Sequence, residues 1–538
     1  MRKVSYGRMP KVQAFSVRRN QWGGTAARGM VNRFLDRVQV FYKKLEKISK
    51  KRETVLVWTF FTALVFGVVI VTGTLTSGFH LVDDWEFAKY VDWMTLDGYS
   101  LWDCLREAVG FDLTLRFRPL YYINRVLMTY LFGINLTVMS VVKAAEIVVT
   151  LAALYYCARQ MKCHMVHAAL FALTVMVGYQ SAVWWKLGPQ ESYDMMMFAV
   201  GFLFLLKWLS ADKRRYAVFS VCAFFLMSIY KEPFILLLPF VGLYVMYDGM
   251  KGKRVTAACL WETVRRRFPY LLAIGVMFAV EMFLILFVIG TNNYSYVGLD
   301  ESVTLDQYVQ VWRVAAGNNL KWYVRFGVLM GLILLTYWEH VKKLGWEILL
   351  AAAIVLPQCV TYSKTALEER YILPCVLGYA FFFVIVGCRF RPLSGKRRIA
   401  YMLCLLLMLA AHGRVTLREA QYFTYRGESI KTMMESTLEL VQGTDKKVLS
   451  CFAPNAEGNK TMYHWFRLHG YDEVFYWEED EKKINRSYGP REDEQADFAD
   501  IDVIVMYNEE DRHWCYEPSL DLTDFTQKKC GTITMYIR

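Results

Sequence analysis

The sequence predicts an α-helical polytopic membrane protein with about eleven spans, followed by a small C-terminal α/β domain. Of its 538 residues, 55% are hydrophobic and 16% are aromatic. One stretch, Val55–Thr76, runs for 22 residues without a charge, which is enough to cross about 30 Å of hydrocarbon at about 1.5 Å per residue. Similar apolar runs recur almost to residue 412, where the composition changes to that of a soluble domain.

The first segment, residues 1–52, is a basic tail. It holds 15 Lys and Arg residues against two acidic ones, Asp36 and Glu46, and it directly precedes the first span. This placement predicts a cytoplasmic N-terminus in contact with anionic membrane lipids. The tail is too long and too basic for a cleaved signal peptide. The net charge of +13 does not indicate a nucleic-acid partner, because no recognition motif accompanies it.

Further apolar runs follow along residues 53–413, which we predict to form one transmembrane domain. The expected spans after the first are residues 136–158, 165–181, 193–209, 216–230, 233–248, 269–290, 325–338, 346–360, 371–388 and 399–413. Threading from a cytoplasmic start leaves five inner loops, and all five are basic: 158–164, 210–215, 248–267, 339–345 and 389–398. The first outer loop, residues 77–118, has eight acidic and four basic residues. This alternation favours a cell membrane protein with loop 77–118 on the extracytoplasmic face.

Residues 414–538 are expected to form a soluble domain, extracytoplasmic if the short last span crosses. "KKVLSCFAP" and "DIDVIVMY" have strand composition, and "MYHWFRLHGY" between them is typical of a helix. The domain has no nucleotide-binding glycine pattern, and its sequence indicates no role.

Five polar segments interrupt or bound apolar runs on the expected outer side. They are "HLVDDWE", "LRFRPLYYIN", "WWKLGPQESYD", "SIYKEPF" and "TYSKTALEERY". Any one of them could be an ordinary helix end with interfacial Trp, Tyr, Lys and Arg. Together they place carboxylates, cations and tryptophans on one face, which favours a functional site.

Two adjacent carboxylates, Asp83 and Asp84, open the first outer loop. Neighbouring carboxylates compete for protons, so one stays ionised while the other forms hydrogen bonds. An ionised aspartate at this surface could act as general base on a hydroxyl group. The alternative is structural, with either residue as N-cap of the helix that "WEFAKYVDWM" would form.

Outer-face cations accompany the doublet, and they are suited to binding phosphate. They are Arg116, Arg118, Lys231 and Arg370. Lys231 could instead pair with Glu232. Other residues of the same segments are candidates to line a substrate site: Trp85, Glu86, Trp184, Trp185, Glu191, Glu232 and Glu369. The two tryptophans Trp184 and Trp185 could equally pack against lipid.

Charges inside the spans give a second interpretation. Lys143 and Glu146 are three residues apart on one helix face and are expected to neutralise each other. Glu281 lies in the middle of an apolar run. A proton-coupled transporter would use such residues, but no internal repeat supports that class.

The order of the motifs resembles the GT-C superfamily of polytopic glycosyltransferases, which use polyprenyl-phosphate sugars. "VDDWE" follows the first span, "FRPL" and "YLFGIN" come next, then "GYQSAVWWKLGPQES", "YKEPFILLLP" and a late "ERYILP". The resemblance covers residues 53–413. It implies that Asp83 activates the acceptor hydroxyl and that Arg370 holds the donor phosphate. Some members of the superfamily need a divalent cation, Mg²⁺ or Mn²⁺. The doublet could bind one, but the sequence supplies no complete ligand set.

We therefore predict a membrane glycosyltransferase that transfers a sugar from a polyprenyl-phosphate donor, with inversion. The acceptor would be a hydroxyl group of a cell-envelope polysaccharide, lipid or protein on the outer face. Asp83 would be the base, with Asp84 its modulator or a group that positions the acceptor. The alternatives are a transporter or flippase for a lipid-linked saccharide, and a scaffold whose C-terminal domain binds a partner.

Overall fold

The computed structural model describes Arg33, Arg37, Val40, Lys44, Leu45 and residues 47–290, 304–335, 344–362, 369–389, 395–452, 456–478, 482–486, 494–509, 514–515, 520–531 and 533–538. The chain divides into two units, Met1–Ser49 and Lys50–Arg538. Most of the expected basic tail and parts of the inner loops 339–345 and 389–398 lie outside the described residues.

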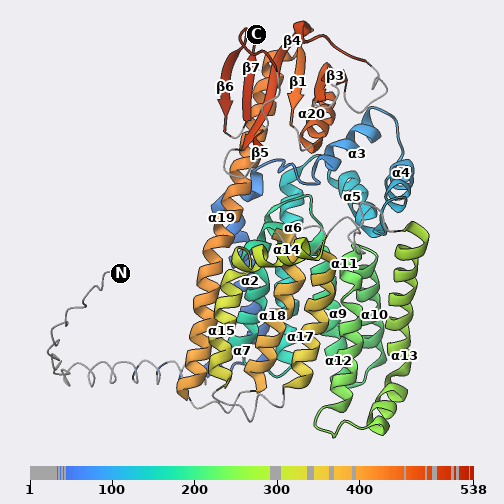
Figure 1. The fold of residues 1–538 in the computed structure, drawn as a ribbon, viewed down its shortest axis with the longest axis vertical. Helices are drawn as coiled ribbons and strands as arrows, with labels where there is room; N and C mark the ends of the chain where they lie inside the picture. The colour runs from blue at the N-terminus through green and yellow to red at the C-terminus, as the bar shows by residue number, and fades with distance from the viewer. Residues whose placement is uncertain are drawn as a thin grey trace, which may run out of the picture. The chain divides into compact units, whose positions relative to one another are not determined.

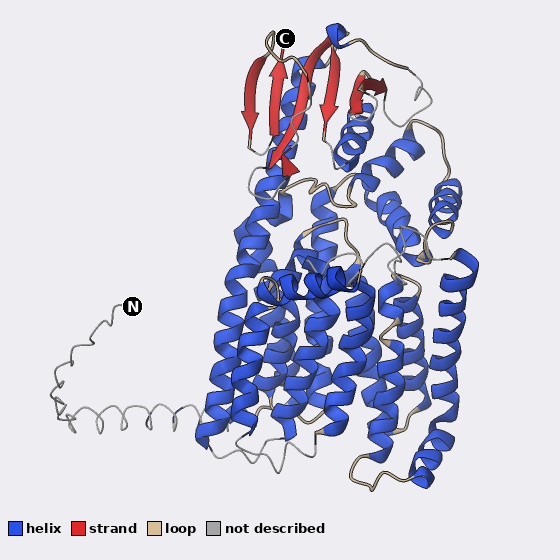
Figure 2. Cartoon of the chain, in the orientation of Figure 1, coloured by secondary structure: helices blue, strands red, loops and turns tan. Residues whose placement is uncertain are grey.

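Helices dominate this unit (Figures 1 and 2). They are α2 (Lys50–Thr72), η1 (Thr74–Thr76), α3 (Trp85–Thr95), α4 (Leu101–Leu113), α5 (Pro119–Phe132), α6 (Leu136–Gln160), α7 (Met165–Met176), η2 (Tyr179–Ser181), α8 (Ala182–Trp185), α9 (Glu191–Ala211), α10 (Arg214–Ser228), α11 (Glu232–Ile235), α12 (Leu238–Met250), α13 (Ala257–Phe283), the π-helical η3 (Leu284–Ile289), α14 (Leu305–Gly317), α15 (Lys321–Leu335), α17 (Gly345–Tyr362), η4 (Glu369–Ile372), α18 (Leu373–Arg389) and α19 (Gly395–Val441).

The predicted helical membrane architecture is confirmed, whereas the number of eleven spans is not. Each expected span coincides with helix over most of its described residues, with breaks at Val177–Gly178 after α7 and at Leu236–Leu237 between α11 and α12. Among the described residues, seven helices are long and apolar enough to cross a membrane. An eighth is possible if α7 and the η2–α8 segment, bent by 72°, form one broken span. Helix α10, with 15 residues, falls short of the roughly 20 residues that a straight crossing needs, whereas α15 and α18 run to the edge of the described residues.

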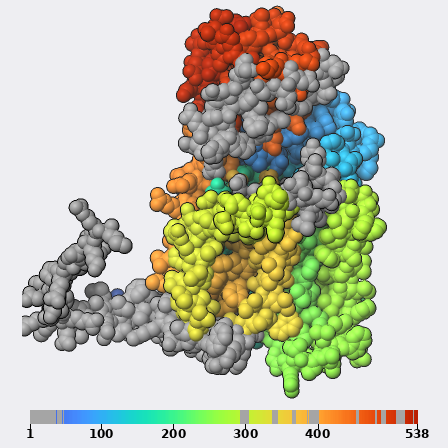
Figure 3. Space-filling model, in the orientation of Figure 1, coloured from blue at the N-terminus to red at the C-terminus, as the bar shows by residue number. Residues whose placement is uncertain are grey.

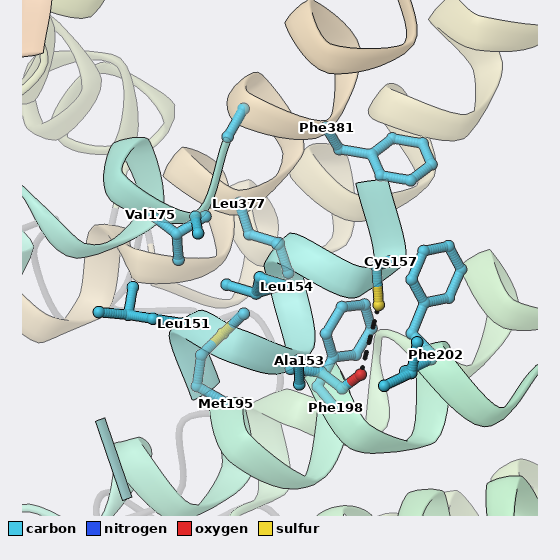
Figure 4. Close-up of a cluster of buried hydrophobic side chains, with 14 of the residues drawn as sticks. Leu151, Ala153, Leu154, Cys157, Val175, Met195, Phe198, Phe202, Leu377 and Phe381 are labelled. Carbon is cyan, nitrogen blue, oxygen red and sulfur yellow. Dashed lines mark hydrogen bonds between the residues drawn. The ribbon is translucent and has the colours of Figure 1, made fainter. Parts of the chain in front are cut away.

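The helical core is built where α6, α7, α9 and α18 meet. Figure 4 shows Leu154 of α6, Val175 of α7, Phe198 of α9 and Leu377 of α18 pointing toward one another. All four side chains are buried. Lipid tails are as apolar as these side chains, so close packing rather than removal from water holds such helices together.

One long helix joins the membrane part to the C-terminal domain. The 47-residue α19 passes the expected domain boundary at residue 414 without a break (Figure 1). It also packs on the start of the loop 77–118, because a Cβ on Gly427 would lie 2.4 Å from the carbonyl oxygen of Ser77. Glycine is therefore required where α19 meets this loop.

The C-terminal domain contains a seven-stranded mixed sheet, as its strand patterns predict. Its elements are β1 (Lys447–Cys451), α20 (Ala456–Leu468), β2 (Val474–Glu478), β3 (Lys483–Arg486), η5 (Phe498–Asp500), β4 (Ile501–Glu509), β5 (Trp514–Cys515), β6 (Thr526–Cys530) and β7 (Ile533–Ile537). The order is β3-β2-β1-β4-β7-β6, with β5 paired to β4. Strand β1 is parallel to β2 and β4, and the other pairs are antiparallel.

Helix α20 lies between the sheet and the first outer loop, where it contacts α3. In the space-filling view the blue residues of the first loop adjoin the orange residues of the C-terminal domain (Figure 3). The contact is ionic: Asp92 of α3 is fully buried, and its Oδ2 lies 2.7 Å from His464 Nδ1 and 2.8 Å from Arg467 Nη1. A buried carboxylate with two such partners fixes the domain against the loop.

Candidate functional site

Asp84 shapes the loop between α2 and α3. Its carboxylate is fully buried and accepts hydrogen bonds from the backbone N–H groups of Val82, at 3.1 Å, and His80. Asp84 stands at the N-cap position of α3, yet its side chain makes no capping bond there. Its acceptor capacity serves the preceding loop instead.

The same loop carries backbone strain. Leu81 has a φ angle of +55°, which is uncommon for a bulky side chain, and Asp83 has a φ angle of +57°, which aspartate adopts more readily. Strain of this kind clusters at functional sites when the surroundings enforce it. Here the enforcing contacts come from Asp84 within the loop and from the residues that pack against it.

Burial controls the ionisation of Asp84 and His80. It raises the pKa of Asp84 to about 6, although the two backbone N–H groups oppose the rise. It also lowers the pKa of His80 to about 3, so the imidazole is neutral and bonds to Ser77 Oγ at 2.8 Å.

Gly188 supports the loop from the segment before α9. A Cβ at this position would lie 1.7 Å from the carbonyl oxygen of Val82, so two backbones touch here. The carbonyl oxygen of Gly188 accepts a hydrogen bond from the buried Arg125. Arg125 Nε in turn lies 3.4 Å from Glu86 Oε2.

We expect Gly188→Ala to lower both the melting temperature and the activity, because the added methyl group must push the Asp83 loop away. Overpacking of a tight contact costs about 1–3 kcal/mol. Thermal unfolding in detergent measures the effect. Gly242→Ala is the matched control, since a Cβ there meets nothing within 4 Å. Equal melting temperatures for both variants would contradict the tight contact.

Asp83 belongs to a connected cluster of four charged side chains. Its Oδ2 lies 3.2 Å from Arg370 Nη1. Arg370 Nε lies 3.3 Å from Glu191 Oε1, and the same oxygen pairs with Lys231 Nζ. Two cations and two carboxylates therefore form a series of connected ion pairs with no net charge.

The four residues come from element ends that meet at one side of the helical layer. Asp83 precedes α3, Glu191 is the first residue of α9, Lys231 is the N-cap of α11, and Arg370 lies in η4 before α18. The middle of "TYSKTALEERY", residues 363–368, lies outside the described residues.

The two cations of the cluster determine the ionisation state of Asp83. Its carboxylate is 32% exposed. Burial alone would raise its pKa, but the charge of Arg370, aided by Lys231, lowers the pKa to about 2. Asp83 is thus ionised at neutral pH, and it is a weak base while Arg370 stays beside it.

The C-terminal domain reaches the same loop through Glu457 of α20. Glu457 Oε2 accepts a hydrogen bond from the backbone N–H of Asp83 at 2.7 Å. Burial is the main cause that raises the pKa of Glu457 to about 8, and repulsion from the Asp83 carboxylate is the second. At neutral pH Glu457 keeps its proton and adds no second negative charge beside Asp83.

The other predicted phosphate ligands are engaged nearby. Arg118 Nε bonds Asp112 Oδ1 at 2.8 Å, and the backbone N–H of Arg116 bonds the Asp112 carbonyl at 2.7 Å. Glu232 accepts from the backbone N–H of Phe117 at 2.8 Å. The alternative pairing of Lys231 with Glu232 is replaced by the pair of Lys231 with Glu191.

The remaining lining candidates are divided between the site and the core. Glu369 pairs with Lys186. Trp85 stacks on the ring of His464, with centroids 6.2 Å apart. Trp184 and Trp185 are 3% and 1% exposed and belong to the helical core, so their rings face neither lipid nor an open site.

The charges inside the spans have local partners. Lys143 donates to the carbonyl of Pro189, and Glu146 Oε2 accepts from Ser192 Oγ at 3.1 Å. Both therefore hold the segment around Gly188. Glu281 Oε1 accepts from Ser228 Oγ at 2.7 Å.

Sequence reasoning missed three contributors to the site. Arg125 could have been found, since it lies two helical turns after Arg118 in an apolar stretch. His80 could also have been found, because it lies four residues before Asp84 in the same polar segment. Glu457 had no such signal, because its domain showed no functional motif.

In the described part of the chain, no group of three or more His, Cys, Asp or Glu residues is arranged to hold a metal ion.

Comparisons with known proteins give structural similarity without sequence similarity. No family model matches the chain, and no curated protein matches it significantly. The oligosaccharyltransferase of Archaeoglobus fulgidus in the apo form is similar at 10% identity and a TM-score of 0.47, over 85% of this chain and 70% of that one. ArnT of Cupriavidus metallidurans in the apo state is similar at 14% identity and a TM-score of 0.44, over 89% of this chain and 98% of that one. ArnT bound to undecaprenyl phosphate gives 12% identity and a TM-score of 0.40, over 91% and 98%.

Proposed function

We propose that the protein is a membrane glycosyltransferase that moves a sugar from a polyprenyl-phosphate donor to a hydroxyl group of a cell-envelope acceptor. The observation that carries the proposal is the contact of Asp83 with Arg370 at the rim of the helical layer. It combines a carboxylate base with a cation suited to phosphate. Helices of membrane-spanning length beside the site supply a surface for a polyprenyl chain.

Arg370 and Lys231 would hold the donor phosphate. Both already bind carboxylate oxygens of Glu191, and a phosphate oxygen is an equivalent acceptor for a guanidinium or an ammonium group. Arg118 lies close enough to lower the pKa of Asp83, so it adds positive charge without a direct bond.

Asp83 would accept the proton of the acceptor hydroxyl. The hydroxyl oxygen attacks the anomeric carbon, the bond from that carbon to the phosphate oxygen breaks, and polyprenyl phosphate leaves with the electron pair. A single displacement inverts the anomeric carbon. When the donor phosphate takes Arg370 from Asp83, the carboxylate loses its main stabilising charge, and its pKa rises toward the range that suits a base.

The transporter alternative has less support. The charged groups that suggested it, Lys143, Glu146 and Glu281, are bonded to nearby protein groups. In these places they stabilise the fold of the helices.

The experiment is donor cleavage by purified protein in lipid nanodiscs, with a panel of polyprenyl-phosphate sugars and a cell-envelope extract as acceptor. We expect release of free polyprenyl phosphate from at least one donor and a product of inverted anomeric configuration. Movement of intact donor across proteoliposomes without cleavage would instead support the transporter.

A further inference from the structure

A cavity of about 280 Å³ lies between the first outer loop and the C-terminal domain. Its walls come from α3, α4, α5 and α20. Five aromatic rings line it: Trp85, Tyr90, Trp93, Phe111 and Tyr122. Aromatic rings offer flat apolar faces with a negative π surface, and the C–H groups on one face of a sugar ring pack well against such surfaces.

Positive charge enters this cavity from two elements. Lys89 Nζ of α3 lies 4.1 Å from the ring centroid of Trp93, and Lys460 Nζ of α20 lies 4.5 Å from that of Trp85. Both lysines line the cavity. Its carboxylate, Glu86, is offset by Arg125 at 3.4 Å. The lining therefore favours a ligand that carries negative charge.

The cavity adjoins the Asp83 loop on the side of α20. Glu457, Lys460 and His464 follow one another at helical spacing along one face of this helix. Glu457 bonds the backbone of Asp83, Lys460 covers Trp85, and His464 stacks on the same ring. Arg370 approaches Asp83 from η4 instead. A ligand in the cavity and a phosphate on Arg370 would thus reach Asp83 from different elements.

We infer that this cavity binds the acceptor as an anionic saccharide, a sugar unit that bears a carboxylate or a phosphate group. The assignment of this ligand as acceptor rests on the proposed glycosyltransferase function. The C-terminal domain then supplies one wall of the acceptor site, through Lys460 and His464. The volume of the cavity is at the lower end of the range for ligand pockets. It suits a sugar unit better than a folded protein segment.

The test is equilibrium binding to the full-length protein in nanodiscs, without donor. The probes are a glucuronate-containing disaccharide, glucose 6-phosphate, a neutral disaccharide and an acidic peptide. We expect wild type to bind one or both anionic sugars at least about 10-fold more tightly than the neutral one, and the difference to shrink at high salt. Which anionic sugar binds identifies the charged group. The double variant Lys89→Gln/Lys460→Gln should lose this preference.

The control is Lys431→Gln, an exposed lysine of α19 outside the cavity, which should keep the wild-type preference. Melting temperatures check the fold, and Lys460→Gln alone serves if the double variant unfolds. Equal binding of neutral and anionic sugars by wild type, or binding of the acidic peptide alone, would overturn the inference. Donor cleavage by a protein that binds neither anionic sugar refutes only the acceptor site. Anionic sugar binding without cleavage of any donor supports the site and refutes the proposed function.

Discussion

Replacing Asp83 by asparagine is expected to lower turnover by about 10²–10⁴-fold, the usual contribution of a general base. Asparagine tolerates the φ angle of +57° as aspartate does, and its amide oxygen can still accept from Arg370. Only the proton-accepting charge is lost. The KM for the donor should stay unchanged or fall, because a neutral amide competes less strongly than a carboxylate for Arg370. Steady-state kinetics with the donor identified in nanodiscs measure both constants.

The matched control is Asp103→Asn in the same outer loop. Asp103 is part of a capping box at the start of α4, and its replacement should leave turnover at the wild-type level. Asp84→Asn should mainly lower the melting temperature, because an amide oxygen can satisfy only one of the N–H groups of His80 and Val82. Near-normal turnover by well-folded Asp83→Asn would refute the base assignment. A loss confined to Asp84→Asn would move the role within the pair.

Arg370→Ala is expected to reduce kcat/KM for the donor on the order of 10²–10³-fold. Loss of one partner from a buried hydrogen-bonded charge pair costs about 2–5 kcal/mol. The variant should also change the pH profile. Burial raises the pKa of Asp83 and Arg370 is the strongest influence that lowers it, so the pKa rises when the guanidinium is removed. A carboxylate base works above its pKa, and the acid limb of the profile therefore moves to higher pH.

Arg370→Lys separates charge from geometry. The ammonium restores the positive charge but not the planar fork that binds Asp83 and Glu191 together, so activity should recover only in part. The acid limb should return most of the way to its wild-type position. An unchanged donor KM in Arg370→Ala would remove this residue from the donor site.

Much of the helical architecture could be predicted, because long apolar runs have few other structures available to them. The strands β1 and β4 and helix α20 were also predicted from their composition. The length of α19 was not, since hydropathy stops indicating a helix where one face becomes polar. The apolar run at α10 was counted as a full span, although the helix has 15 residues.

The residue types of the candidate site could be predicted from the sequence. The contacts between these residues could not. Asp83, Glu191, Lys231 and Arg370 were selected because charge at the ends of apolar runs is expensive. Their mutual contacts depend on how distant helices pack, and no local pattern encodes that. Glu457, 374 residues from Asp83, shows the limit most clearly.

Gly188 shows a different limit. The motif "WWKLGPQES" drew attention to its tryptophans, which are buried in the core. The structural constraint lies in the glycine between them and Glu191, where the backbone of the Asp83 loop passes too closely for any side chain. A close backbone approach leaves no signal in a single sequence beyond the glycine itself.

The central claim is that Asp83 and Arg370 carry out glycosyl transfer from a polyprenyl-phosphate donor. The most direct measurement compares wild type and Asp83→Asn in parallel nanodisc preparations, with a radiolabelled donor, so that donor occupancy and polyprenyl phosphate release are recorded together. The account predicts equal occupancy in both proteins, and release that is slower by about 10²–10⁴-fold in the variant. Equal release by both proteins, or no release by wild type from any bound donor in the presence of acceptor, would contradict it.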